Sequence, residues 1–209
     1  MGAGRFISLE GGEGVGKSTQ LDALSQALEG RGLEVLVTRE PGGSPGAEAI
    51  RKLLLEGEDT RWTPRAEALL FAAARADHVA KTIKPALAKG VWVLSDRFLD
   101  SSLAYQGEAG GLGIDAVRDL HRFGSEDFLP DRTLVLQLPD GEGARRAASR
   151  DSDGADRIGG RSPAYHAQVD AGFRKMAEAE PDRVQIIDAS GNAQTVTARL
   201  LYALGDLLP

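Results

Sequence analysis

Short apolar runs alternate with longer amphipathic stretches along the chain. Five runs rich in apolar and β-branched residues predict strands, at residues 5–10, 34–40, 90–97, 133–138 and 184–189. Between them, apolar residues at helical spacing predict helices, at residues 17–30, 45–57, 64–89, 114–126, 141–150, 162–180 and 193–207. Strands that alternate with helices predict a three-layer α/β fold, with a five-stranded parallel sheet covered by helices on both faces.

The order of these elements also predicts where a ligand binds. In open parallel sheets, ligands lie at the carboxyl ends of the strands. Segments 11–18, 39–43 and 96–106 each follow a predicted strand. We therefore expect these three segments to converge at one edge of the sheet.

Composition narrows the class of protein. The chain has 209 residues, enough for one well-buried domain, and we expect a single domain over residues 1–209. Its net charge of −6 argues against a broad basic face and therefore against nucleic acid as a partner. It has no cysteine, no apolar run of the ~20 residues that a membrane span needs, and no secretory signal at its start. These features predict a cytoplasmic protein that binds no membrane.

The run GGEGVGKST matches the phosphate-loop pattern G-x-x-x-x-G-K-[ST], between a predicted strand and a predicted helix. Backbone N–H groups of such a loop face the phosphates of a nucleotide. The candidate ATP-binding residues are Gly11, Gly12, Glu13, Gly14, Val15, Gly16, Lys17, Ser18 and Thr19. Lys17 is placed to reach the transferred phosphoryl group, and Ser18 to reach Mg²⁺. The alternative is a glycine-rich turn without a ligand, and the carboxylate of Glu13 needs an explanation in either case.

A second acidic element lies at the end of the predicted strand VWVLSDR, which finishes with Asp96 and Arg97. An aspartate at such a strand end is the usual partner of a phosphate loop near Mg²⁺, bound directly or through water. It caps a following helix about as often. Arg97 favours the functional interpretation, because a guanidinium group can hold a phosphate through two hydrogen bonds.

The phosphate loop alone leaves the class of enzyme open. The guanine-reading pattern N-K-x-D is absent, since the only asparagine, Asn192, precedes Ala193. A small phosphotransferase fits best, and it needs a second substrate site and a cover that excludes water. The arginine-rich segment 143–161 has the composition of a mobile lid that brings arginines to the phosphoryl group, although a solvated loop would have the same composition.

Two segments are candidates for the second substrate site. Phe71 and Arg75 lie one helical turn apart, so that the ring can stack on a base while the guanidinium donates to its edge. Taken by itself, a phenylalanine at such a position is more often a core residue. The run SSLAYQG, residues 101–107, is polar and ends in glycine after an apolar strand, which is typical of a substrate loop.

Five motifs together resemble the bacterial thymidylate kinases: GGEGVGKST, TREPGGSPGAEAIRKLLLEG, EALLFAAAR, SDRFLDSSLAYQG and DRIG, in the family's order and spacing. They cover most of residues 5–107, and a weaker match continues to the C-terminus. The resemblance implies transfer of the γ-phosphoryl group of Mg-ATP to dTMP, giving dTDP and ADP in dTTP synthesis for DNA replication. It also implies a P-loop nucleoside monophosphate kinase fold and a homodimer, for which the alanine-rich helix at 65–83 is one candidate interface.

The resemblance further implies a role for each matching residue. Residues that would bind dTMP are Glu13 at the 3′-hydroxyl, Arg39, Arg51 and Arg97 at or near the phosphate, Phe71, Arg75 and Ser102 at the base, Gln106 close to the same pocket, and Tyr105 beneath the sugar. Ser101 would also belong to the dTMP site. Lys17, Asp96 and Arg97, with Arg150 and Arg157 from the lid, would form the catalytic set, and Arg146 would lie against adenine. After Arg157 and Ile158 the family's acidic residue is replaced by Gly159, so the lid assignments rest on the weaker part of the match.

Two rival functions remain open at this point. A kinase of the same fold could act on another nucleotide or deoxynucleoside, and a nucleotide-binding regulatory protein could bind ATP without transferring phosphate. Turnover with a panel of acceptors distinguishes all three.

Overall fold

The computed structural model describes residues 3–139, 142–143 and 157–209. One five-stranded sheet has the order β2-β3-β1-β4-β5, and all of its strand pairs are parallel. The strands are β1 (Phe6–Glu10), β2 (Val35–Arg39), β3 (Trp92–Asp96), β4 (Arg132–Gln137) and β5 (Val184–Asp188). The predicted α/β fold and its five strands are therefore confirmed.

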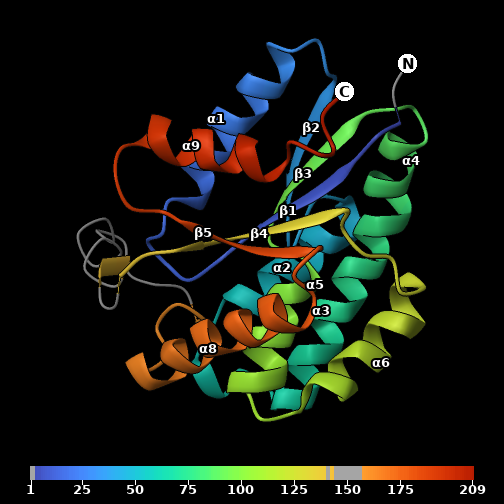
Figure 1. Cartoon of the computed structure of the whole chain (residues 1–209). Coiled ribbons are helices and arrows are strands. Elements are labelled where there is room, and N and C mark those ends of the chain that lie inside the picture. Colours follow the sequence, from blue (N-terminus) through green and yellow to red (C-terminus); the bar gives the residue numbers. More distant parts are fainter. Residues whose placement is uncertain (1–2, 140–141, 144–156) are drawn as a thin grey trace.

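Helices cover both faces of this sheet (Figure 1). They are α1 (Lys17–Glu29), α2 (Pro45–Leu55), η1 (Asp59–Arg61), α3 (Pro64–His78), η2 (Val79–Ile83), α4 (Lys84–Leu87), α5 (Leu99–Ser102), η3 (Leu103–Ala109), α6 (Ile114–Ser125), α8 (Pro163–Ala179) and α9 (Ala193–Ala203). The leucines of α1 and the apolar side of α9 pack on one face of the sheet. The η3 and α8 segments, with Val79 and Ile83 of η2, pack on the other face, where Phe6, Phe98 and Phe173 are fully buried.

Strand register brings the three predicted ligand segments together. Asp96 pairs in register with Leu9 of β1 on one side and with Arg39 of β2 on the other. The segments that leave these three strands therefore start side by side at the carboxyl edge of the sheet, as predicted.

The segment after β3 differs from its predicted form. We expected a substrate loop at residues 101–107, but α5 and η3 form a continuous helical segment there. Leu99 and Leu103 are fully buried in the core, so tertiary packing overrides the polar, glycine-ended composition. The η3 segment is a π-helix, a wider form of helix that is frequent at functional sites.

Most of the predicted lid lies outside the described residues, as does the predicted helix at 141–150 except for residues 142 and 143. Among the described residues, none of the helices has the length and apolar character that crossing a membrane requires.

Candidate active site

The loop between β1 and α1 has the backbone that a phosphate cradle needs. Gly11 and Gly16 have φ angles of 130° and 93°, which residues other than glycine rarely adopt. A Cβ atom at Gly11 would also collide with the carbonyl oxygen of Leu136. Lys17 folds back over this loop, and its Nζ donates to the carbonyls of Gly11 (3.1 Å) and Gly12 (2.8 Å).

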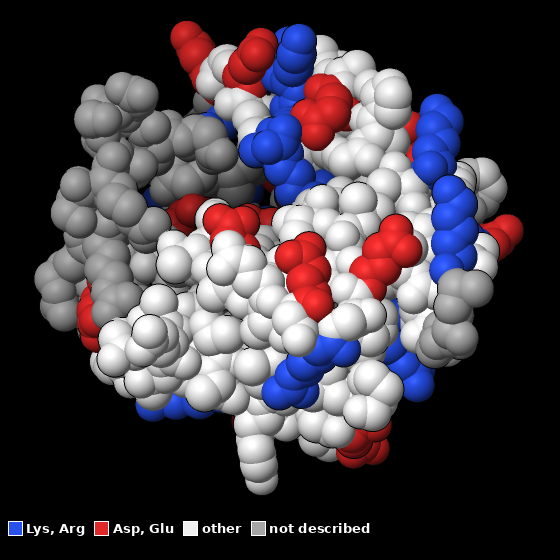
Figure 2. Space-filling view, turned by 90° about the horizontal axis from the view of Figure 1, so that it is seen from above, with Lys and Arg blue, Asp and Glu red and all other residues white. Residues whose placement is uncertain are grey.

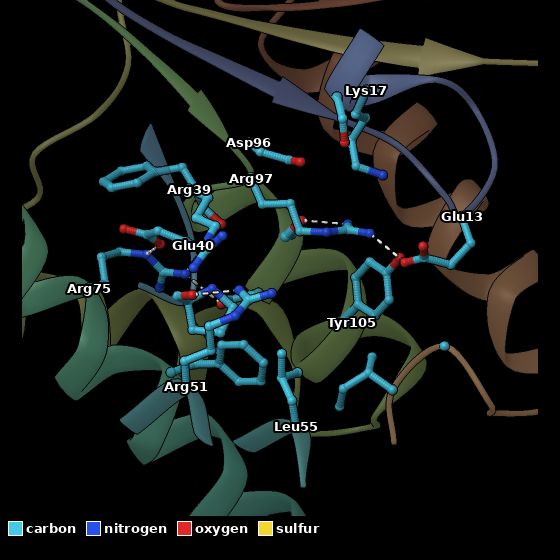
Figure 3. A pocket seen from close by; sticks show the side chains of 18 of the residues that line it. Glu13, Lys17, Arg39, Glu40, Arg51, Leu55, Arg75, Asp96, Arg97 and Tyr105 are labelled. Atoms are coloured by element: carbon cyan, nitrogen blue, oxygen red, sulfur yellow. Dashed lines mark hydrogen bonds and ion pairs between the residues drawn. The ribbon is translucent and has the colours of Figure 1, made fainter. Parts of the chain in front are cut away.

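A cavity of about 530 Å³ opens beside this loop (Figure 3). Loop residues, four arginines and the side chains of α3, α5 and η3 share its wall. The lining residues are Glu13, Gly14, Gly16, Lys17, Ser18, Arg39, Glu40, Pro41, Arg51, Leu55, Phe71, Arg75, Asp96, Arg97, Phe98, Ser101, Ser102, Tyr105, Gln106, Ile158 and Gly159. Every residue that the resemblance assigned to the acceptor nucleotide is in this wall.

Phe71 and Arg75 reach the cavity from α3, as their spacing predicts. Phe71 is half-buried and lies outside both hydrophobic core clusters of the described residues, which argues against the core interpretation. Arg75 is 3% exposed; its Nε donates to Glu40 (2.8 Å) and its Nη2 to Ser102 (2.7 Å). The second oxygen of Glu40 contacts His78 Nδ1 at 3.0 Å. A buried cation is thus held in place at the cavity wall by a buried carboxylate.

Sequence reasoning missed Glu40, although it lies inside the quoted run TREPGG. Its signal is weak, because its partners Arg75 and His78 lie 35 and 38 positions away. Separating Arg75 from Glu40 would leave an uncompensated buried charge. This cost keeps Arg75 in the orientation that its hydrogen bond with Glu40 requires.

Arg97 links the phosphate loop to the acceptor side. Its Nη2 donates to Glu13 (2.7 Å), and its Nη1 donates to the carbonyl of Gly11 and to Ser101 (both 3.1 Å). The guanidinium also lies over the ring of Tyr105, 5.1 Å from its centroid. Figure 3 shows Arg97 pointing toward Glu13, with Tyr105 beside them.

The charges around this pair alter its proton affinity. Partial burial alone would raise the pKa of Glu13, but the charges of Arg97 and Lys17 lower it below its ordinary value. Desolvation, with the nearby charge of Arg97, lowers the pKa of Lys17 to about 8. Glu13 is therefore an anion at neutral pH, and a bound phosphate would favour the charged form of Lys17.

Beneath Arg97, Glu10 is fully buried, and it was also missed by sequence reasoning. It accepts hydrogen bonds from Ser101 (2.5 Å), from the backbone N–H of Phe98 (2.7 Å) and from Ser8 (2.9 Å). Burial, together with the charge of Asp100, raises the pKa of Glu10 to about 7. These bonds hold the turn at Arg97, whose φ of 69° is unusual for a residue with a side chain.

The two remaining cavity arginines come from β2 and α2. Arg51 Nη1 donates to the carbonyl of Pro41 at 2.7 Å, and Arg39 forms an exposed ion pair with Glu48 at 3.2 Å. With Arg75 and Arg97 they place four guanidinium groups around one cavity of an acidic protein. Such a cavity suits an anion that carries an organic group.

Asp96 lies at the cavity end of β3. Its Oδ1 is buried and has no hydrogen-bond partner among the described residues. An unsatisfied buried carboxylate oxygen near a phosphate loop is a suitable ligand for a cation or for its bound water. No group of three or more histidine, cysteine or acidic side chains in the described part of the chain could hold a metal ion without help from other ligands.

Of the three predicted lid arginines, only Arg157 is among the described residues, and it is not brought to this site. Arg146 and Arg150 lie outside the described residues. The side chain of Arg157 is fully buried, donating to the carbonyl of Leu54 (2.9 Å) and to Glu67 (2.6 Å), and it is not part of the cavity wall. Its neighbours Ile158 and Gly159 line the cavity instead.

Comparison with known proteins identifies the family. A family model for thymidylate kinase matches residues 9–200. The chain belongs to the thymidylate kinase family. It is 61% identical to the thymidylate kinase of Rhizorhabdus wittichii over 99% of both chains. It is also 47% identical to that of Caulobacter vibrioides, over 96% of this chain and 95% of the relative.

A solved structure supports the same family assignment for the fold. The crystal structure of thymidylate kinase from Ehrlichia chaffeensis superposes with a TM-score of 0.79 at 30% identity, covering 97% of this chain and 99% of the other. The thymidylate kinase resemblance in the motifs of the first half therefore extends over nearly the whole chain.

Proposed function

We propose that the cavity binds dTMP while the loop from Gly11 to Thr19 binds ATP, so that the two substrates meet between Lys17 and Arg97. The chain is an ATP-dependent dTMP kinase, which transfers the γ-phosphoryl group to dTMP and forms dTDP and ADP in dTTP synthesis for DNA replication. The observation that carries the two-substrate arrangement is the shared wall: one cavity is lined by the phosphate loop and by four arginines.

The acceptor's base would lie against Phe71, with Arg75 and Ser102 at its edge. Arg75 has guanidinium donors in a fixed position, which match the carbonyl oxygens of a pyrimidine. Ser101 would contribute through Arg97, because its hydroxyl oxygen accepts a hydrogen bond from Arg97 Nη1.

The acceptor's phosphate would lie among the remaining cavity arginines. Arg51 and Arg97 supply planar forks that can bind a phosphate through two hydrogen bonds, and Arg39 adds positive charge at the open side. The sugar would then lie between Tyr105 and Glu13, with the Glu13 carboxylate accepting a hydrogen bond from the 3′-hydroxyl. The buried ring of Tyr105 would leave no room for a ribose 2′-hydroxyl.

The donor side rests on the loop backbone, on Lys17 at the transferred phosphoryl group, and on Ser18 and Thr19 at the start of α1. We keep Arg146 at adenine and Arg150 at the phosphoryl group as proposals from the resemblance. For Arg157 a direct role in transfer would require it to leave Glu67 and Leu54, so its placement favours a structural role.

Mg²⁺ fits the same site. Ser18 and the unsatisfied Oδ1 of Asp96 would hold it, directly or through water, together with the phosphates of ATP. When bound it neutralises charge on those phosphates. The chain's own groups align the two anions, and phosphoryl transfer needs no strong general base from them.

A substitution of Glu13 in the phosphate loop should distinguish the acceptor site from the ATP site. Glu13→Gln should raise KM for dTMP about 10-fold, because a hydrogen bond to a charged group is lost and Arg97 loses its ion pair. KM for ATP should change by less than about twofold, because backbone N–H groups hold ATP. Steady-state kinetics against both substrates measure this, with Glu126→Gln, a surface ion-pair variant, as the control. Equal effects on both KM values would contradict the assignment.

The aromatic wall can be tested separately. Phe71→Ala should raise KM for dTMP by about 10-fold to 100-fold, since base–aromatic stacking contributes about 1–3 kcal/mol. ATP binding, measured by calorimetry without dTMP, should be unchanged. Tyr202→Ala, which shortens an aromatic side chain that is 89% exposed on α9, is the control. An unchanged KM would return Phe71 to a packing role.

We further propose a homodimer through the helices on the α3 side of the sheet. Helix α3 packs against α2 and α6, and each of these three helices carries a large exposed apolar side chain: Leu53, Leu69 and Phe123. Phe123 is 94% exposed, so an interface over these helices would remove a large apolar side chain from water.

The interface prediction concerns assembly. Phe123→Glu should shift the protein from about twice its chain mass of 22.1 kDa to that mass, because a buried unpaired charge opposes association. Sedimentation velocity measures the change, with Tyr202→Glu, an equally exposed aromatic on α9, as the control. A variant that remains at the wild-type mass would exclude this surface.

The proposed partners are nucleotides, with neither nucleic acid nor membrane among them. On the face seen in Figure 2, positive and negative side chains are interspersed, in keeping with the net charge of −6. We place the enzyme in the cytoplasm and treat residues 1–209 as one functional domain.

The direct test of transfer is product identification. Incubation with ATP, Mg²⁺ and dTMP should yield dTDP and ADP in equal amounts, and chelation of Mg²⁺ should stop the reaction. ATP binding without any ADP formation on adding dTMP would instead favour a regulatory nucleotide-binding protein.

A further inference from the structure

Behind the cavity wall lies a buried carboxylate to which the resemblance assigns no role, although it opens the motif EALLFAAAR. Glu67, in the first turn of α3, is 3% exposed. Its Oε2 accepts from Nη2 of Arg157 and from Nη2 of Arg161, both at 2.6 Å. Guanidinium groups carry donors only, so the carboxylate that binds both of them offers its oxygens as acceptors.

The other oxygen of Glu67 holds a residue of the cavity wall. Gln106 Nε2 donates to Glu67 Oε1 at 3.0 Å, and Gln106 is itself 3% exposed and lines the cavity. A side-chain amide has one donor end and one acceptor end. Since Glu67 can only accept, it takes the nitrogen end, and the carbonyl oxygen is the end that Gln106 offers to a ligand.

Beside this acceptor, Arg75 and Ser102 offer hydrogen-bond donors. Arg75 carries donors only, and its Nη2 already donates to Ser102 Oγ, so the Ser102 hydroxyl hydrogen points elsewhere. The wall therefore presents donors from Arg75 and Ser102 next to an acceptor from Gln106. Thymine matches this pattern with its O4 acceptor and N3–H donor, whereas cytosine presents an N4 amino donor and an N3 acceptor at the same places.

We propose that Glu67 is a positioning residue that determines base specificity: by holding the amide nitrogen of Gln106, it turns the amide oxygen toward N3–H of thymine and disfavours cytosine. This inference rests on the proposed binding of dTMP in the cavity. Glu67 itself is not part of the cavity wall and acts only through Gln106.

The readout is the ratio of kcat/KM for dTMP to kcat/KM for dCMP. A general loosening of the site affects both acceptors, whereas a change in amide orientation affects the ratio. Glu67→Gln should lower the ratio about 10-fold or more, because its side chain can donate or accept and Gln106 is then free to turn. Glu67→Asp keeps the negative charge but shortens the side chain, which should weaken the 3.0 Å contact with Gln106, so a lower ratio is expected there too.

Tyr165→Phe is the matched control. The Tyr165 hydroxyl accepts from Arg161 and donates to the carbonyl of Tyr105, both within 2.7 Å, but does not contact the Gln106 amide. This variant should change kcat/KM for both acceptors by the same factor and leave the ratio unaltered. Melting temperatures identify any variant that fails to fold, and Glu67→Asp, which keeps a negative charge near Arg157 and Arg161, keeps the comparison available if Glu67→Gln does not fold.

An unchanged ratio in a folded Glu67 variant, or an equal change of the ratio in Tyr165→Phe, would overturn the inference. Failure of the underlying function is a separate result, since it would appear as poor turnover of dTMP by the wild-type enzyme.

Discussion

Lys17→Ala is expected to lower kcat by about 10³-fold or more while leaving the fold intact. The loss of one preorganised electrostatic donor at a transition state costs about 10²–10³-fold, and Lys17 is a full charge in a site shielded from water. Its present contacts are two loop carbonyls, which a phosphate would replace or share. Coupled ADP-release kinetics at saturating ATP and dTMP measure the effect.

The control for this variant is Lys89→Ala, which removes an exposed lysine just after α4. Circular dichroism and the melting temperature should show both variants folded. A near-normal kcat for Lys17→Ala would contradict the role of the loop in transfer.

Arg97→Lys is expected to lower kcat/KM for dTMP by about 10²-fold, even though the charge is retained. Arg97 reaches Glu13, Gly11 and Ser101 at once through two nitrogens, a geometry that an ammonium group cannot reproduce. Misplacement of a substrate by about 1 Å can cost 10²-fold in rate. The loss should appear in both KM for dTMP and kcat, because the same fork would align the acceptor phosphate.

Arg5→Lys, at the surface ion pair with Asp131, is the control for Arg97→Lys and should be close to wild type. Retention of wild-type kcat/KM by Arg97→Lys would show that positive charge alone is sufficient. That result would contradict the bidentate clamp.

Two carboxylates of the cavity wall hold arginines in place. Arg75 is held by Glu40 and Arg97 by Glu13, and both pairs lie in the cavity wall. Each pair fixes a guanidinium group before substrate binds, which lowers the ordering cost of binding. The wall keeps an excess of cations over carboxylates, so the net charge of −6 does not prevent binding of anionic nucleotides.

The sequence predicted the parallel sheet and the phosphate loop well, because both depend on local signals. Apolar runs mark the five strands, and the glycine spacing of residues 11–16 marks the loop. The helical form of residues 99–109 was not predictable in this way. It depends on the burial of Leu99 and Leu103 among residues that are distant in the sequence.

The candidate site followed the same division. Phe71, Arg75 and Arg97 were found because short motifs carry them. Glu40 and Glu67 were missed because the contacts cited for them are with residues 35 or more positions away. The motif placed Arg157 at the phosphoryl group, but the structure pairs it with Glu67. The pairing of buried charges depends on tertiary structure, so a short motif does not reveal it.

The most direct test of the account is the ranking of acceptors by kcat/KM in a coupled ADP-release assay with dTMP, dUMP, UMP, dCMP, dGMP and AMP. We predict that dTMP is the best acceptor. UMP should be poor because Tyr105 leaves no room for its 2′-hydroxyl, and dCMP should be poor because its base does not match the donors and acceptors of Arg75 and Gln106. A higher kcat/KM for any other monophosphate in the panel would contradict the proposed pocket.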